Sequence, residues 1–224
     1  MHKKQITIQS LLAQKLLPLY YHEDVAVSKD ILVALYDAGI RILEYTNRGE
    51  AALENFRFLR KVVTTEMPGL QLGIGTVKNR SQAENYIKAG ADFIVCPSVN
   101  IEVGNLVQEA GLLWIPGCMT PTEIATAENC GANIVKIFPG NLLGPSYITS
   151  IRDLFAQLQF VVTGGVAAEA VNLERWFQAG VVGVGMGSAL FTKKRIDEKD
   201  YKGLTKETVV ALKLVHEAYA LEQK

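Results

Sequence analysis

The sequence of 224 residues predicts an α/β protein, a (β/α)8 barrel preceded by a short N-terminal helix. Short apolar segments alternate along the chain with amphipathic segments of roughly ten to fifteen residues, as in parallel sheets covered by helices. The apolar segments are apolar at odd and even positions alike, which is typical of strands buried on both faces. Eight such units favour a closed barrel over an open doubly wound sheet, which usually has fewer strands and a glycine-rich turn after the first one.

Each expected strand is a short run rich in branched and aromatic residues. In chain order the expected strands span 17–21, 41–45, 71–75, 92–96, 113–115, 133–138, 160–163 and 181–185. A glycine precedes five of them, in the segments DAGIRILEY, KAGADFIVC, EAGLLWIPG, NCGANIVKI and QAGVVGVGM. Glycine in this position predicts the end of a helix, because it adopts the left-handed conformation that commonly closes one.

Each expected helix is an amphipathic segment between two strands or beyond the last one. In chain order the expected helices span 5–15, 27–38, 50–65, 80–89, 101–110, 120–129, 145–157, 169–178 and 205–221. No linker rich in proline and serine interrupts this order. We therefore expect one domain over residues 1–224, with the barrel core at about 17–191 and a helical tail at about 192–224.

Composition excludes several classes of protein. Lysine plus arginine and aspartate plus glutamate both number 23, so the formal net charge is zero and no nucleic-acid partner is expected. The basic start, MHKK, is not followed by the apolar core of a signal peptide, and no segment is long enough to span a membrane. Cys96, Cys118 and Cys130 fit no zinc pattern, and we expect three reduced thiols in a cytoplasmic protein.

Lys136 is the sharpest candidate for chemistry, because it interrupts an apolar strand. Its neighbours are Ile134, Val135, Ile137 and Phe138. In a (β/α)8 barrel, reactive groups gather at the carboxyl ends of the strands. Burial there lowers the pKa of a lysine from about 10.4, which favours the neutral, nucleophilic amine. A buried ion pair without catalytic function is the alternative.

Glu44 has the same character in the segment IRILEYTNR. It shares one face of its strand with Ile42 and Thr46, and if that face is the barrel interior it can meet Lys136. Such a pair is either structural or the minimum set for Schiff-base chemistry, a nucleophile and a proton shuttle. Arg48, four residues later, is either a two-point holder of a carboxylate or a surface arginine.

Two glycine-containing segments follow the seventh and eighth strands, VVTGGV at 161–166 and GVGMGSALF at 183–191. Glycine lets backbone N–H groups approach an anion, and these two loops form the usual phosphate site of the barrel fold. Each could also be a mere tight turn. No pair of histidines has the spacing of metal ligands, so no metal site is expected.

Seven segments together resemble one family, the 2-keto-3-deoxy-6-phosphogluconate (KDPG) and 2-keto-4-hydroxyglutarate (KHG) aldolases. They are GIRILEYTNRGE, GIGTVKN, ADFIVCPSVN, IPGCMTPTE, IVKIFPG, VVTGGV and GVGMGSALF, spread from about Leu17 to Phe191. The family consists of class I, Schiff-base, pyruvate-dependent lyases on a (β/α)8 barrel. It is usually cytoplasmic, commonly homotrimeric, and needs neither a metal nor an organic cofactor.

The resemblance implies a role for each matching residue. Lys136 resembles the Schiff-base lysine and Glu44 the general acid/base. Arg48 and Thr76 resemble the residues that hold the pyruvate carboxylate. The remaining matches are the walls beside the reacting carbons, a contact to the substrate hydroxyls, and the phosphate site: Pro97 and Phe138, Thr163, and Gly164, Gly165, Gly187 and Ser188.

The resemblance also implies the reaction, cleavage of a phosphorylated 2-keto-3-deoxy sugar acid to pyruvate and an aldehyde. The expected small-molecule substrate is 2-keto-3-deoxy-6-phosphogluconate, with 4-hydroxy-2-oxoglutarate and 2-keto-3-deoxy-6-phosphogalactonate as alternatives. A sugar-phosphate epimerase or isomerase and a non-catalytic barrel that binds sugar acids rank below. The chain departs from the family at Tyr20, Tyr21 and His22, where some members have an arginine, and at Asn47, where an apolar residue is common.

Overall fold

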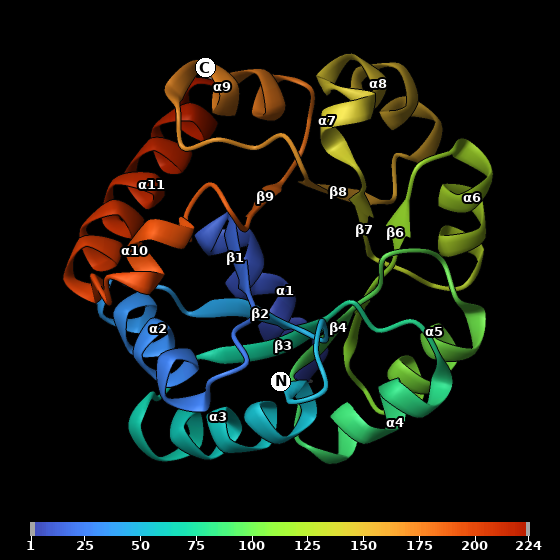
Figure 1. Ribbon diagram of the computed structural model, residues 1–224. Coiled ribbons are helices and arrows are strands. Elements are labelled where there is room, and N and C mark those ends of the chain that lie inside the picture. Colours follow the sequence, from blue (N-terminus) through green and yellow to red (C-terminus); the bar gives the residue numbers. More distant parts are fainter. Residues whose placement is uncertain (1–2, 223–224) are drawn as a thin grey trace.

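The chain folds as a barrel of parallel strands surrounded by helices (Figure 1), in a computed structural model that describes residues 3–222. The outermost residues of the expected domain, 1–2 and 223–224, lie outside the described part. One sheet of nine strands has the order β5-β4-β3-β2-β1-β9-β8-β7-β6. The strands are β1 (Leu16–Tyr20), β2 (Ile42–Thr46), β3 (Gln71–Gly75), β4 (Phe93–Val95), β5 (Leu113–Ile115), β6 (Gly117–Cys118), β7 (Ile134–Ile137), β8 (Gln159–Thr163) and β9 (Gly183–Met186). The predicted (β/α)8 barrel is confirmed.

The barrel closes through one chain segment that is interrupted at Pro116. β5 pairs with β4, whereas β6 pairs with β7, so the two ends of the sheet order are consecutive in the sequence. Pro116 lacks the N–H group that a continuous strand needs. Its carbonyl oxygen still accepts a hydrogen bond of 2.8 Å from the backbone N–H of Lys136. β5 and β6 therefore act as the fifth strand of the barrel, which the sequence predicted over 113–115 alone.

The helices lie outside the strands. They are α2 (Val25–Asp37), α3 (Ala52–Glu66), α4 (Arg80–Lys88), α5 (Ile101–Glu109), α6 (Pro121–Asn129), α7 (Gly140–Leu143), α8 (Pro145–Ile151) with a 3-10 turn (Arg152–Phe155), α9 (Ala170–Gln178), α10 (Lys193–Asp197) and α11 (Tyr201–Glu222). α7 and α10 were not predicted, because four- and five-residue helices are too short to show a periodic pattern. No helix within residues 3–222 is long and apolar enough to cross a membrane.

The five glycines that precede strands adopt the predicted backbone conformation. Their φ angles lie between 70° and 100°, the values belonging to Gly39, Gly90, Gly111, Gly131 and Gly180. Each follows the last turn of a helix, and a residue with a Cβ would be strained there. These turns set the point at which each helix returns to the sheet.

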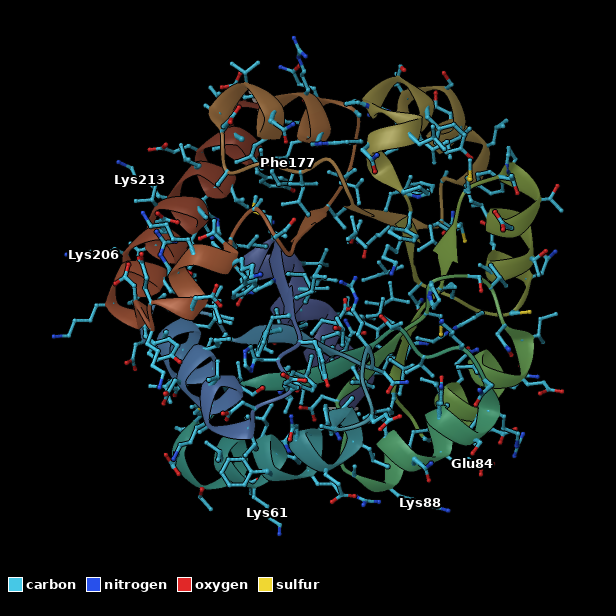
Figure 2. The ribbon with its side chains drawn as sticks, in the orientation of Figure 1. Lys61, Glu84, Lys88, Phe177, Lys206 and Lys213 are labelled. Carbon is cyan, nitrogen blue, oxygen red and sulfur yellow. The ribbon has the colours of Figure 1, made fainter. Side chains whose placement is uncertain are left out.

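Two apolar clusters divide the core. The larger one fills the layer between strands and helices, where α9 contributes Phe177, whose ring packs edge-on against Tyr219 of α11. Figure 2 shows Phe177 directed into the molecule, while lysines such as Lys61 and Lys213 extend from the outer helix surfaces into solvent. The smaller cluster fills the barrel interior. It includes Ile8 from α1 (Lys3–Gln14), the helix that lies across the amino ends of the strands.

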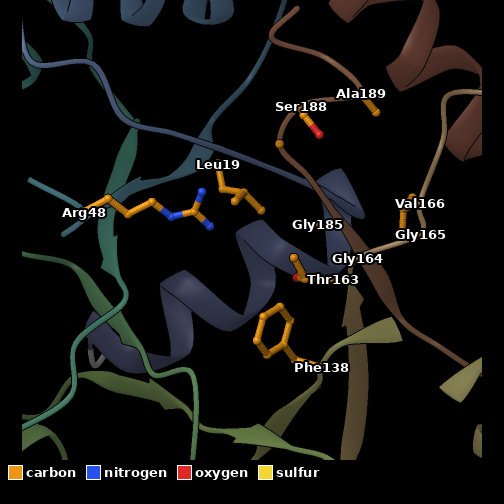
Figure 3. A pocket seen from close by; sticks show the side chains of 11 residues that line it. Leu19, Arg48, Phe138, Thr163, Gly164, Gly165, Val166, Gly185, Ser188 and Ala189 are labelled. Atoms are coloured by element: carbon orange, nitrogen blue, oxygen red, sulfur yellow. The ribbon is translucent and has the colours of Figure 1, made fainter. Parts of the chain in front are cut away.

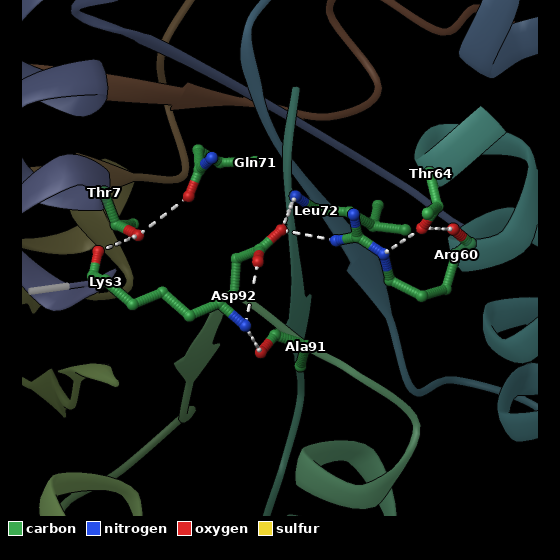
Figure 4. A network of polar contacts seen from close by, with 8 residues as sticks. All are labelled: Lys3, Thr7, Arg60, Thr64, Gln71, Leu72, Ala91 and Asp92. Atoms are coloured by element: carbon green, nitrogen blue, oxygen red, sulfur yellow. Dashed lines mark hydrogen bonds and ion pairs between the residues drawn. The ribbon is translucent and has the colours of Figure 1, made fainter. Parts of the chain in front are cut away.

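Polar contacts fix α1 to this end of the barrel. The Gln14 side chain accepts a 3.0 Å hydrogen bond from Ile42 N–H and donates one of 2.7 Å to Ile42 C=O. Asp92, just before β4, receives three donors (Figure 4): Lys3 Nζ at 3.0 Å, Arg60 Nη1 at 2.6 Å and the backbone N–H of Leu72 at 2.7 Å. The amino end of the barrel is therefore sealed, and the opposite end is left for a site.

Candidate active site

Lys136 and Glu44 both point into the barrel interior. Lys136 lies on the same face of β7 as Ile134, and Glu44 on the same face of β2 as Ile42; both isoleucines belong to the interior cluster. The two charged residues are 7% and 3% exposed. They come from strands on opposite sides of the barrel, so the predicted common face is the interior.

Burial dominates the protonation of both groups. It lowers the pKa of Lys136, an effect that the Glu44 carboxylate opposes and the Arg48 guanidinium reinforces. Burial also raises the pKa of Glu44, against the pull of Lys136 and Arg48. Within residues 3–222 the ammonium and carboxylate form no direct ion pair. The interior therefore increases the neutral fraction of the Lys136 amine and the protonated fraction of the Glu44 carboxyl group.

The Phe138 ring covers Lys136 at the mouth of the barrel. Lys136 Nζ lies 4.9 Å from the centre of this ring, on its face. The ring also borders a cavity of about 220 Å³, which we call the loop cavity (Figure 3). Its lining residues are Leu19, Arg48, Phe138, Thr163, Gly164, Gly165, Val166, Gly185, Gly187, Ser188 and Ala189. Six predicted site residues therefore share this cavity with Phe138, whereas Lys136, Glu44, Thr76 and Pro97 do not line it.

The loop after β8 depends on glycine for close packing. Gly164 and Gly165 have φ angles of 93° and 74°. A Cβ on Gly165 would lie 2.8 Å from the Cα of Asn141 in α7, so no larger residue fits. Asn172 of α9 fixes the same loop, because its side chain accepts from Ala167 N–H and donates to Gly165 C=O. Short backbone approaches of this kind suit an anion site.

Arg48 lies in the loop after β2, and its guanidinium points into the loop cavity (Figure 3). The loop is anchored by the residue before it, because Tyr86 Oη donates a 2.8 Å hydrogen bond to Asn47 Oδ1. Asn47 N–H also donates to Gly75 C=O at 2.9 Å. Asn47 thus holds the loop that carries Arg48. The sequence around Asn47 did not indicate this function.

Thr76 and Pro97 lie at the mouth beside β3 and β4. Thr76 has a φ angle of 62°, a left-handed conformation that is rare and costly for a β-branched residue. Such strain clusters at functional sites. The carbonyl oxygen of Pro97 packs against Gly117, where a Cβ would lie 2.4 Å away. Both residues are half-buried.

Two further residues escaped the sequence reasoning, because Gly75 leaves space for the Glu44 side chain and Asn141 supports the glycine loop. Thr46, which shares the face of Glu44, buries a hydroxyl that has no hydrogen-bond partner within residues 3–222. Within the described residues, no three His, Cys, Asp or Glu side chains are grouped so that they could hold a metal ion. His22 accepts a hydrogen bond from Asp24 N–H at 3.1 Å, beside the start of α2.

Comparison with known proteins identifies the family. Residues 8–207 match the sequence profile of the KDPG and KHG aldolases. A 2-dehydro-3-deoxy-6-phosphogalactonate aldolase of Escherichia coli is 36% identical over 121 residues, which are 54% of this chain and 58% of that protein. A 2-dehydro-3-deoxy-phosphogluconate aldolase of Zymomonas mobilis is 32% identical over 153 residues, 67% of this chain and 70% of that protein.

Solved structures agree with this assignment. The crystal structure of 2-keto-3-deoxy-6-phosphogluconate aldolase from Zymomonas mobilis has a TM-score of 0.80 at 25% identity, covering 92% of this chain and 95% of that one. A cube-shaped protein cage designed by fusing symmetric oligomeric domains has a TM-score of 0.82 at 25% identity, covering 93% of this chain and 74% of that one. The chain belongs to the KDPG and KHG aldolase family.

Proposed function

We propose that the chain is a class I aldolase that cleaves 2-keto-3-deoxy-6-phosphogluconate to pyruvate and glyceraldehyde 3-phosphate. The carrying observation is the buried amine of Lys136, which has a lowered pKa and faces the buried Glu44 carboxyl group. 4-Hydroxy-2-oxoglutarate and 2-keto-3-deoxy-6-phosphogalactonate are alternative substrates for the same chemistry. An epimerase, an isomerase or a non-catalytic binding barrel would leave this amine without a function.

The reaction begins with attack of the neutral Lys136 amine on the C2 ketone. Glu44 supplies the proton with which the carbinolamine loses water, and an iminium forms. The Glu44 carboxylate, directly or through a water, then takes the proton of the C4 hydroxyl. The C3–C4 bond breaks, its electron pair enters the iminium, and an aldehyde leaves an enamine of pyruvate on Lys136. Protonation at C3 and addition of water release pyruvate and the free amine.

The remaining site residues divide between the two ends of the substrate. Arg48 and Thr76 would hold the pyruvate carboxylate, and Pro97 and Phe138 would border the reacting carbons. The other end would contact Thr163 through a hydroxyl, and its phosphate would bind to the two loops at Gly164, Gly165, Gly187 and Ser188. Support for this division comes from the loop cavity, which joins the loops after β8 and β9 to Arg48 and Phe138.

Assembly and location are further parts of the proposal. We infer a single barrel domain that forms a homotrimer in the cytoplasm. The likeness to a cage built from symmetric oligomeric domains supports an oligomer. The thiols of Cys96, Cys118 and Cys130 are free, as suits a reducing compartment. Size-exclusion chromatography with light scattering tests the trimer, and a mass near 24.6 kDa would contradict it.

Borohydride reduction in the presence of pyruvate tests the Schiff base. The peptide that contains Lys136 should gain one reduced pyruvyl group, and Lys136→Arg should gain none. Lys15 provides a matched control, because its pKa is also lowered by burial but it lies at the amino end of the barrel. Lys15→Arg should label as the wild type does. An unlabelled wild-type protein, or label that persists in Lys136→Arg, would refute the assignment.

Pyruvate release tests the reaction and its substrate. Each of the three substrates is offered to the wild type and to Glu44→Gln in a coupled assay. Glu44→Gln should lose about 100-fold or more in kcat, as expected for removal of a general acid/base, while its circular dichroism spectrum stays unchanged. Unaltered turnover would remove Glu44 from the mechanism. The substrate with the highest kcat/KM identifies the preferred acid.

A further inference from the structure

A second, smaller cavity adjoins the loop cavity at the barrel mouth. It has a volume of about 180 Å³, and we call it the side cavity. Its lining residues are Leu19, Tyr20, Tyr21, Thr46, Arg48, Gly187, Ser188 and Phe191. Four of them, including Gly187 and Ser188, also line the loop cavity, whereas Lys136 and Phe138 are not among them. The side cavity therefore adjoins the loop of Gly187 and Ser188, which is proposed for the phosphate end, and not the Phe138 ring that covers the reacting amine.

Thr46 lines this cavity and carries a buried hydroxyl group. The residue is 1% exposed, and within residues 3–222 its Oγ1 has no hydrogen-bond partner. Its neighbour Tyr45, on the opposite face of β2, does have one, because Tyr45 Oη donates to the His22 carbonyl oxygen at 2.9 Å. A buried hydroxyl without a partner destabilises a protein, and such groups in native structures call for an explanation. A ligand atom in the side cavity supplies one.

The other walls of the side cavity carry hydrogen-bonding groups as well. Ser188 and Tyr21, whose side chains end in hydroxyl groups, line it together with Arg48, whose guanidinium is assigned above to the pyruvate carboxylate. Tyr21 reaches over Gly49, where a Cβ would lie 2.1 Å from Tyr21 Oη, so the glycine makes room for the phenol. A cavity with these groups suits an oxygen-bearing substituent better than an apolar one.

We propose that the side cavity binds a hydroxyl group on the acceptor half of the substrate, and that Thr46 recognises this hydroxyl. The proposal rests on the aldolase function proposed above. In a phosphorylated 2-keto-3-deoxy sugar acid the hydroxyl concerned is that of C5, one carbon beyond the bond that breaks. Thr46 stands two residues after Glu44 on the inward face of β2, so its hydroxyl follows the acid/base group toward the acceptor end. Thr46 is thus a specificity residue that binds the part of the substrate that becomes the aldehyde and does not contact the part that becomes pyruvate.

Two assays separate the halves of the substrate. Cleavage of the phosphorylated sugar acid that the wild type prefers uses both halves. Exchange of the methyl protons of pyruvate for deuterium, followed by NMR, uses Lys136 and the pyruvate half alone. Thr46→Val keeps the shape of the side chain and removes its hydroxyl, and Thr46→Ser restores the hydroxyl as the matched control.

Thr46→Val should lower kcat/KM for cleavage by about 5- to 10-fold, as expected for one lost hydrogen bond to an uncharged group. Pyruvate exchange should stay within about 2-fold of the wild type, and Thr46→Ser should recover most of the cleavage rate. The thermal midpoint of Thr46→Val without substrate should be equal or higher, because no hydrogen bond within the protein is lost. Tyr21→Phe, an independent variant of the same cavity, should also impair cleavage and spare exchange.

Each other outcome overturns the proposal. Equal losses in cleavage and exchange would place Thr46 at the pyruvate end, and unchanged cleavage would make its hydroxyl merely structural. A wild type that exchanges pyruvate but cleaves no hydroxylated substrate would refute the subsite and leave the Schiff-base chemistry standing. A wild type that does neither would refute the aldolase function itself, and the subsite with it.

Discussion

The carboxyl group of Glu44 lies directly over Gly75. A Cβ built on Gly75 would stand 1.6 Å from Glu44 Oε1 and 2.3 Å from its Cδ. In the register of β2 and β3, Gly75 pairs with Thr46 and Gly73 pairs with Glu44, so the Glu44 side chain leans along β3 toward the barrel mouth. The position of the proposed acid/base group therefore depends on the absence of a side chain on the neighbouring strand.

Gly75→Ala should displace the Glu44 carboxyl group and lower kcat/KM about 100-fold, since a misplacement of about 1 Å has effects of this size. The measurement is pyruvate release under steady-state conditions. Gly183→Ala is the matched control, because it adds a methyl group to an interior strand at the amino end, where the nearest atom is 3.2 Å away. Full activity of a folded Gly75→Ala protein would show that Glu44 is not tied to this position.

The rate of borohydride trapping by pyruvate should depend on pH through Lys136. Only the neutral amine attacks, and burial lowers the pKa of Lys136 from 10.5, so the trapping rate should rise with pH and reach half its maximum below pH 10.5. A midpoint at or above that value would contradict the lowered pKa. The measurement is the initial trapping rate at saturating borohydride over a series of buffers of constant ionic strength.

Two variants should move this midpoint in opposite directions. The Glu44 carboxylate raises the pKa of Lys136, so Glu44→Gln should move the midpoint to lower pH. The Arg48 guanidinium lowers that pKa, so Arg48→Gln should move the midpoint to higher pH. Because Arg48 is exposed, its effect should be the smaller one and should shrink as salt is added. Shifts of the same sign would exclude an electrostatic origin.

The features of the fold and the site that depend on a local sequence pattern could be predicted. Glycine before a strand marks a helix end, and side chains two residues apart share a face, so the barrel and the inward direction of Glu44 and Lys136 could be predicted. Both follow from local backbone geometry. The continuation of the fifth strand beyond Pro116, as β6, was missed, because a proline followed by a glycine usually marks the end of a strand.

Contacts between segments far apart in the sequence could not be predicted. The space that Gly75 leaves for Glu44, the support of Gly165 by Asn141, and the anchoring of Asn47 by Tyr86 each join two different elements. Nothing in either local segment shows the register or the loop packing that brings such a pair together. The strained backbone of Thr76 is likewise a product of the surrounding fold.

Asp92→Asn should lower stability and spare activity, because Asp92 collects three donors at the sealed end of the barrel. Asp92 is buried, but Lys3 and Arg60 are 46% and 22% exposed, so the cost should lie below the about 3–5 kcal/mol of a fully buried pair, at about 2 kcal/mol. Chemical denaturation measures the change in the free energy of unfolding. Glu207→Gln, which disrupts an exposed pair with Arg195, is the control and should cost at most about 1 kcal/mol. Equal effects of the two variants would deny Asp92 its structural role.

The loop after β8 should serve the phosphate end alone. Gly165→Ala introduces a Cβ into a backbone with a φ of 74° and places it 2.8 Å from Asn141 Cα, so the loop must shift. KM for the phosphorylated substrate should rise about 10-fold, as expected for loss of about 1.4 kcal/mol of binding, while deuterium exchange into pyruvate should not change.

Gly69→Ala is the control that separates backbone strain from loop contact, because Gly69 has a φ of 82° and no atom lies within 4 Å of its added Cβ. It should cost about 1–2 kcal/mol of stability and leave KM unaltered. If Gly165→Ala slows pyruvate exchange as much as cleavage, the loop acts on the reacting amine, and the phosphate must bind elsewhere.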